Sequence, residues 1–126
     1  MIHIDISYDM KQVPITALYV SKIAEGYGLS PKRASMPCFV LEAIMETRMK
    51  QVHRDDPILR LDIEERKAKL MIRVTDKGLP YVLAEKERHI LESGAVDRFL
   101  FEQLGADGQR LSLFYKLPSD YTAPEG

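Results

Sequence analysis

The sequence predicts an α/β fold of the α+β kind, a two-layer sandwich in which a mostly antiparallel sheet is covered on one face by helices. Three observations lead to this prediction. Apolar and polar residues alternate in four short segments, which is typical of half-buried strands. Two long segments between the first and second of these carry apolar residues at helical spacing. A short charged link joins the second segment to the third, which favours antiparallel pairing.

The size and charge of the chain narrow the function classes. Its 126 residues suit one domain, expected over 1–117, with a polar tail or linker at 118–126. Lys and Arg number 18 against 19 Asp and Glu and are spread evenly, so neither nucleic acid nor a membrane is an expected partner. A single cysteine, Cys38, excludes an intramolecular disulfide. No apolar run approaches the ~20 residues of a transmembrane helix, and no signal peptide pattern is seen, so the expected location is the cytoplasm.

The first strand and the first helix lie near the N-terminus. Isoleucine alternates with polar residues over 2–7, which predicts a strand. Val13-Pro14 opens the helix, because proline is tolerated in the first turn. Gly26 and Gly28 end it, because glycine is the common residue just past a helix.

The second helix is expected to begin at Ser30-Pro31, with Ser30 as its N-cap. Pro37 lies inside this pattern, so either the helix kinks there or its regular part begins there. Helical spacing of apolar residues then continues from Phe39 to about His53.

Three more strands complete the predicted sheet. Apolar residues occupy alternate positions over 59–64 and 68–75, and the short link between these segments predicts a hairpin. Asp-Lys-Gly-Leu-Pro at 76–80 has the composition of a turn. The same alternation returns over 110–117, which predicts the last strand.

Two motifs in this layout resemble those of a known family. Leu-Glu-Ala-Ile-Met-Glu at 41–46 stands on the second long helix, and Val-Thr-Asp-Lys-Gly-Leu-Pro at 74–80 follows the hairpin. Their order and spacing resemble the histidine-kinase-like ATPase superfamily (the Bergerat fold), in its anti-sigma-factor serine-kinase branch. Members carry Glu-Ala-x-x-Asn on a long helix and Asp-x-Gly-x-Gly or Asp-x-Gly-x-Pro after a hairpin. The resemblance covers 13–117.

The resemblance assigns roles to the residues that match these motifs. Asp76 would accept a hydrogen bond from the adenine amino group, and Gly78 would let the backbone pass close to the base. Glu42 would be the catalytic base, polarising the attacking hydroxyl or water. Glu46 replaces the asparagine that binds magnesium in the family; a carboxylate can hold this ion but adds negative charge beside the phosphates. Without the other motif, the tripeptide Asp-Lys-Gly at 76–78 would be interpreted as an ordinary turn after a strand.

The phosphate-binding lid of the family is the least preserved part. Residues from about 82 to 104 are expected to be mostly helical, broken near Ser93-Gly94. Members carry Gly-x-Gly-Leu before the last helix, where backbone amides cradle the phosphates. Here Gly94 stands as a remnant, and Arg98 would contact phosphate through its guanidinium. The favoured alternative is a plain amphipathic helix over 96–104 that packs on the sheet.

The remaining candidates for chemistry are weaker. Glu42, Glu46 and His53 share a helix face and could hold a metal, although a solvated charged face is the favoured interpretation. The other two histidines, at positions 3 and 89, are expected to be surface or satisfied residues. Cys38 has no evident partner and is expected to be a buried, inert thiol.

Three functions remain open from the sequence. The favoured one is a degenerate ATPase-like regulatory domain that binds ATP and magnesium weakly or not at all. It would act by docking a protein partner, sigma-factor-like or otherwise regulatory, or an adjacent domain. The second is an active ATP-dependent serine/threonine protein kinase of the anti-sigma type. The third is a non-nucleotide-binding module of a larger enzyme. Relatives of this kind often pair as dimers, so a homodimer is one expected assembly.

Overall fold

The computed structural model describes residues 1–7, 9–51, 58–76 and 83–118. Five strands form one sheet in the order β1-β2-β3-β5-β4, and every neighbouring pair is antiparallel. The predicted fold class, an antiparallel sheet in a two-layer α+β sandwich, is confirmed. In chain order the elements are β1 (Ile2–Ser7), α1 (Gln12–Gly26), α2 (Pro31–Gln51), β2 (Ile58–Arg66), β3 (Lys69–Asp76), α3 (Glu85–Glu92), β4 (Arg98–Gln103), a 3-10 turn (Gly105–Asp107) and β5 (Gln109–Lys116).

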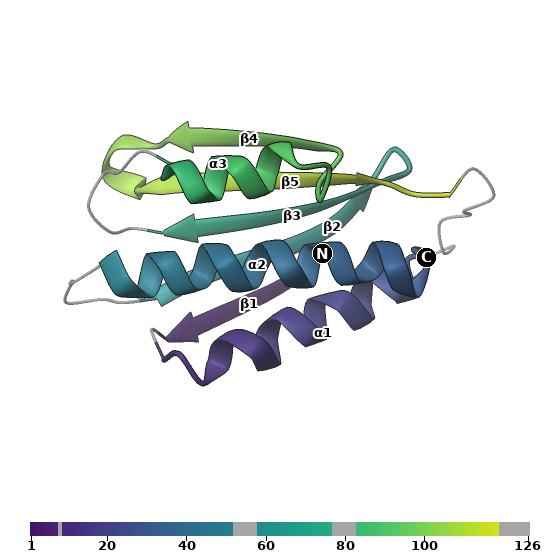
Figure 1. Cartoon of the computed structure of the whole chain (residues 1–126), viewed down its shortest axis with the longest axis horizontal. Coiled ribbons are helices and arrows are strands. Elements are labelled where there is room, and N and C mark those ends of the chain that lie inside the picture. The colour runs from purple at the N-terminus through teal and green to yellow at the C-terminus, as the bar shows by residue number, and fades with distance from the viewer. Residues whose placement is uncertain (8, 52–57, 77–82, 119–126) are drawn as a thin grey trace.

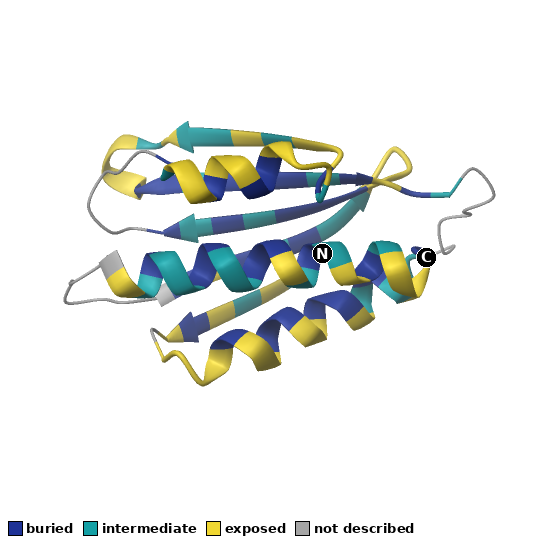
Figure 2. Ribbon diagram, in the orientation of Figure 1, coloured by how far each residue is buried: buried dark blue, intermediate teal, exposed yellow. Residues whose placement is uncertain are grey.

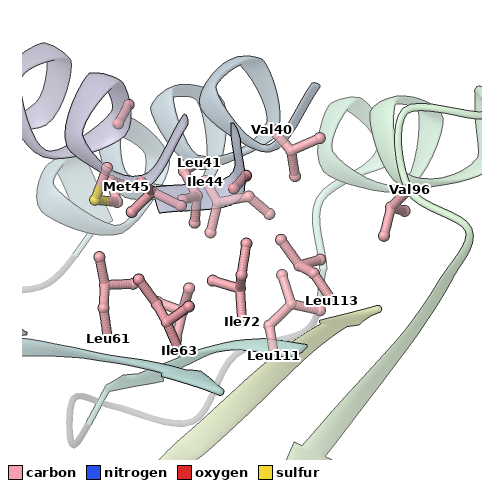
Figure 3. Packing of buried hydrophobic residues seen from close by; sticks show 14 of the residues in the cluster. Val40, Leu41, Ile44, Met45, Leu61, Ile63, Ile72, Val96, Leu111 and Leu113 are labelled. Atoms are coloured by element: carbon pink, nitrogen blue, oxygen red, sulfur yellow. The ribbon is translucent and has the colours of Figure 1, made fainter. Parts of the chain in front are cut away.

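The three α-helices lie on the same face of the sheet, with α2 between α1 and α3 (Figure 1). Their buried sides face the strands, and the exposed residues lie on the outer side of each helix (Figure 2). Figure 3 shows the apolar side of α2 pointing at the sheet. Burying a leucine-sized side chain contributes about 1.5–3 kcal/mol, so this single cluster dominates the stability of the fold. Its central members are Leu41, Ile44, Met45, Leu61, Ile63, Ile72, Leu111 and Leu113.

The N-terminus of α2 follows the predicted capping. The backbone N–H of Arg33 donates to Oγ of Ser30 at 3.2 Å, so the predicted N-cap of α2 is confirmed. α2 runs as one helix from Pro31 through Pro37, so its regular part does not begin at Pro37. α1 ends at Gly26, as predicted.

The predicted helix over 96–104 is wrong, because this segment contains the strand β4. Val96, Leu100 and Leu104 are spaced four apart, and this spacing imitates a helix. In the structure Phe99 and Phe101 pack against the core, while Leu100 is 44% exposed on the other face. Pairing with β5 along the whole of β4 decides the conformation, since strand preference depends on cross-strand neighbours more than on local propensity.

The helical stretch before β4 is also shorter than predicted. Within the described residues only α3 is α-helical between 83 and 97. Gly94 has φ +94°, directly after the C-cap Ser93, which is the left-handed position that ends many helices. The predicted break near Ser93-Gly94 is therefore confirmed, and it is the end of the helix.

Candidate functional site

The helix-facing side of the sheet becomes polar at one end. Along β3 the residues Leu70, Ile72 and Val74 face the core, and Asp76 continues this alternation at the last position of the strand. Gln109 lies directly opposite Asp76 on β5 and also faces the helices. The two residues are 2% and 1% exposed, so two polar side chains occupy core positions here.

A buried ion pair joins α2 to α3. The C-terminal end of α2 and the N-terminal end of α3 lie at the same end of the molecule as the end of β3 (Figure 1). Nη2 of Arg48 donates to Oε2 of Glu87 at 2.9 Å and to Oε1 at 3.2 Å. Oε1 of Glu87 also accepts from the backbone N–H of Ala84 at 3.1 Å, which caps the first turn of α3. Both side chains are only 1–2% exposed, so their charges are almost fully removed from water.

Sequence reasoning missed this pair, although a signal for it exists. Arg48 continues the helical spacing of Leu41, Ile44 and Met45, which puts a cation on the apolar face of α2. Glu87 likewise shares a face with the two buried apolar residues of α3. Opposite charges at core-facing positions of two helices predict a buried pair, because an unpaired buried charge is too costly.

The two glutamates of the predicted catalytic motif lie beside the apolar face of α2, and both are half-buried. Sγ of Cys38 donates to Oε1 of Glu42 at 3.8 Å, one helical turn away. Burial raises the pKa of the Cys38 thiol, and the charge and hydrogen bond of Glu42 raise it further. A thiol held in its neutral form is a poor nucleophile, which agrees with the predicted inert character. The prediction that Cys38 is buried is wrong, because the residue is only partly buried. Glu46 lies one turn further along α2, and its role as a magnesium ligand stays a prediction.

The segment assigned to the phosphate lid is tied to the rest of the fold. Nη2 of Arg33 donates to Oδ2 of Asp97 at 2.7 Å, and Nη1 donates to the carbonyl of Lys116 at 3.0 Å. The backbone N–H of Lys116 donates to the same Asp97 oxygen at 2.7 Å. The hydroxyl of Tyr115 donates to the carbonyl of Ala95 at 3.0 Å, and burial raises its pKa. These bonds fix the backbone between α3 and β4.

The structure separates two residues that the resemblance brings together. Arg98 begins β4 on the face of the sheet opposite the helices, where its guanidinium lies 5.8 Å from the ring centroid of Phe114. Asp76 lies on the helix-facing side, at the other end of β3 and β5. Arg98 is therefore far from any nucleotide whose adenine is bound at Asp76. Gly78, the other predicted nucleotide contact, lies outside the described residues.

The predicted metal and histidine candidates give no site in the described residues. Within those residues no group of three or more His, Cys, Asp or Glu side chains is arranged to hold a metal ion, and His53 lies outside them. His3 contacts Asp62 across β1 and β2, which confirms it as a satisfied surface residue. His89 is exposed in the last turn of α3. None of the described helices has the length and apolar character to cross a bilayer.

Comparison with known proteins leaves the geometry as the main guide to function. No protein-family model matches the chain, and no curated protein matches its sequence. The candidate site is the polar end of the helix-facing side, where Asp76 and Gln109 lie opposite each other on β3 and β5 and the Arg48–Glu87 pair joins α2 to α3. Such an arrangement offers a carboxylate acceptor at the end of a central strand and a buried salt bridge between two of the helices that cover the sheet.

Proposed function

We propose that this chain is a degenerate ATPase-like regulatory domain, which binds adenine weakly and acts by docking a protein partner. The observation that carries the proposal is the position of Asp76. A carboxylate at the end of a central strand, 2% exposed and facing the helices, is costly to keep unless it serves a ligand or a polar network. The resemblance expects the adenine acceptor at this residue.

Contacts to the phosphates are expected to contribute little to the free energy of nucleotide binding. Gly94 serves as a helix terminator, and the segment up to Asp97 is fixed by Arg33 and Lys116. Glu46 adds a negative charge where a magnesium-binding amide is expected. The contacts that remain are therefore those to the base, and adenosine should bind about as well as ATP.

Titration calorimetry with adenosine, ATP, and ATP with magnesium tests this proposal. We expect dissociation constants weaker than about 100 μM, similar for all three, with binding lost in Asp76→Ala. Asp107→Ala, which changes an exposed aspartate in the β4–β5 turn, is the matched control and should bind as the parent does. Circular dichroism shows whether each variant is folded.

Two results would count against the proposal. ATP binding that is micromolar, depends on magnesium and supports phosphoryl transfer abolished by Glu42→Gln would favour the active kinase. A folded protein that binds neither adenosine nor ATP would favour a module with no nucleotide site.

A further inference from the structure

The sheet face opposite the helices carries more cations than acids. Alternation along each strand gathers these residues on one face, although Arg and Lys are spread evenly along the sequence. The acids are concentrated near β1 and β2, where Asp62 contacts His3 and Arg60. The cations on this face are Arg60, Arg66, Lys69, Arg73, Arg98, Arg110 and Lys116, and the acids are Asp5, Asp62, Glu64 and Glu102.

Three of these cations lie side by side across three strands. Arg66 of β2 is directly opposite Lys69 of β3, which is directly opposite Lys116 of β5. Lys67, in the turn between β2 and β3, adds a fourth charge, and we call these four residues the cationic row. Arg66 pairs with Glu64 of its own strand at 3.3 Å, whereas among the described residues neither Lys67 nor Lys69 forms an ion pair. Like charges directly opposite each other destabilise a sheet, so an anion across the row would relieve a repulsion that the free protein carries.

A hollow with an apolar lining adjoins the cationic row. It has a volume of about 190 Å³ and is lined by Arg66, Lys67, Lys69, Met71 and Phe114. Met71 and Phe114 are directly opposite each other on β3 and β5. Pockets for drug-sized ligands measure about 300–1,000 Å³, so this hollow suits one apolar side chain and not a nucleotide. A methionine adapts easily to such an occupant.

We infer that this face docks an acidic peptide segment of a partner protein. One apolar side chain of the segment enters the hollow between Met71 and Phe114, and its carboxylates lie along the cationic row. The inference rests on the proposed function only in naming the kind of partner that such a regulatory domain docks. It needs no nucleotide at Asp76.

The composition of the face favours a peptide over single-stranded RNA. RNA-binding sheets stack successive bases on several aromatic side chains. Among the described strand residues of this face, Phe114 is the single Phe, Tyr or Trp, and Arg98 already covers its ring. His3 lies on β1, with two strands between it and β5, and contacts Asp62. Glu64 and Glu102 also lie among the cations. Their carboxylates would repel a continuous phosphate backbone.

Fluorescence anisotropy with three labelled synthetic peptides tests the inference on the intact chain. The peptides alternate Glu with Leu, Glu with Ser, and Lys with Leu. We expect the Glu–Leu peptide to bind best, at least tenfold more tightly than either of the others, and to weaken as salt is raised. Lys67→Glu with Lys69→Glu should weaken its binding at least tenfold. Lys32→Glu with Lys86→Glu, an equal charge change at exposed helix positions, should change it less than twofold.

Several outcomes would overturn the inference. Equal binding of the Glu–Leu and Glu–Ser peptides would remove the role of the hollow. Equal losses in the two double variants would show that net charge, and not the cationic row, drives binding. No binding of the Glu–Leu peptide, or tighter binding of a labelled uridine oligonucleotide, would also overturn it. The comparison of the three peptides and the oligonucleotide on the parent protein tests the inference even if a variant does not fold. Adenosine binding is measured separately, so the failure of one proposal leaves the other intact.

Discussion

The buried ion pair between α2 and α3 allows a quantitative test of the fold around the candidate site. The perturbation is to replace Arg48 by Met and Glu87 by Leu, singly and together. Each single change leaves one charge in a site where the parent side chains are 1–2% exposed. Removing one partner of a buried pair costs about 3–5 kcal/mol, because the remaining charge has lost its compensation. In Glu87→Leu the first turn of α3 also loses its cap on Ala84.

The double change removes both charges and fills the site with apolar groups of similar size. Such replacements are often neutral or stabilising by about 1–4 kcal/mol. The double variant should therefore be much more stable than either single variant, and the cycle should give a coupling energy of several kcal/mol. For a chain of this length each kcal/mol moves the melting temperature by about 4 °C, so the single variants should melt roughly 12–20 °C below the parent.

Urea unfolding at constant pH, followed by circular dichroism, supplies the free energies of unfolding. Arg88→Met and Glu92→Leu are the matched controls, because both residues are exposed on α3. Each control should change stability by less than about 0.5 kcal/mol. If Arg48→Met costs no more than Arg88→Met, the pair contributes no buried interaction and the reasoning is refuted.

Three further predictions concern single elements. Ser30→Ala should lower the free energy of unfolding by about 1 kcal/mol and Ser30→Asp should not, since only the first loses the N-cap acceptor of α2; equal effects in urea unfolding would contradict this. Because burial and Glu42 raise the pKa of Cys38, its alkylation by iodoacetamide should rise with pH only above the range usual for a thiol. Glu42→Gln should lower that pKa and speed alkylation at a fixed pH near 8, and a slower reaction would be the contrary result. Replacing Lys67-Ala68 by Asn-Gly should stabilise the chain by about 1 kcal/mol, because φ is +54° and +60° at these two positions; a loss of stability would contradict this.

Most of the sheet and both long helices could be predicted from the sequence. Period-two alternation identifies β1, β2, β3 and β5, because each has one apolar side against the helices and one mainly polar side facing away. β4 could not be predicted this way. The strand is only 6 residues long, Leu100 interrupts its outer face, and the four-residue spacing of Val96, Leu100 and Leu104 imitates a helix. Pairing with β5 is a long-range effect that local pattern does not contain.

The candidate site was predictable in part. Asp76 could be singled out because a turn motif follows a strand, and the structure shows that its side chain faces the helices. The direction in which Glu42 and Glu46 point could not be predicted from the sequence. Half-buried positions beside an apolar helix face suit a glutamate of a binding site as well as a glutamate of a solvated surface. The cationic row could not be predicted from the sequence either, because it depends on the register between three strands.

The concentration of buried polar residues at one end is the strongest structural argument for a binding role there. Asp76 and Gln109 take positions that continue the apolar alternation of β3 and β5, and the opposite end of the same strands is apolar. If apolar residues replaced Asp76, Gln109, Arg48 and Glu87, the fold would no longer bear the free-energy cost of removing these polar groups from water. If the double variant Arg48→Met with Glu87→Leu is as stable as the parent, stability does not explain the pair. We then expect the same variant to bind adenosine at least fivefold more weakly, because the directional hydrogen bonds that fix α3 relative to α2 are lost. Unchanged adenosine binding in a stable double variant would show that the pair has no part in the site.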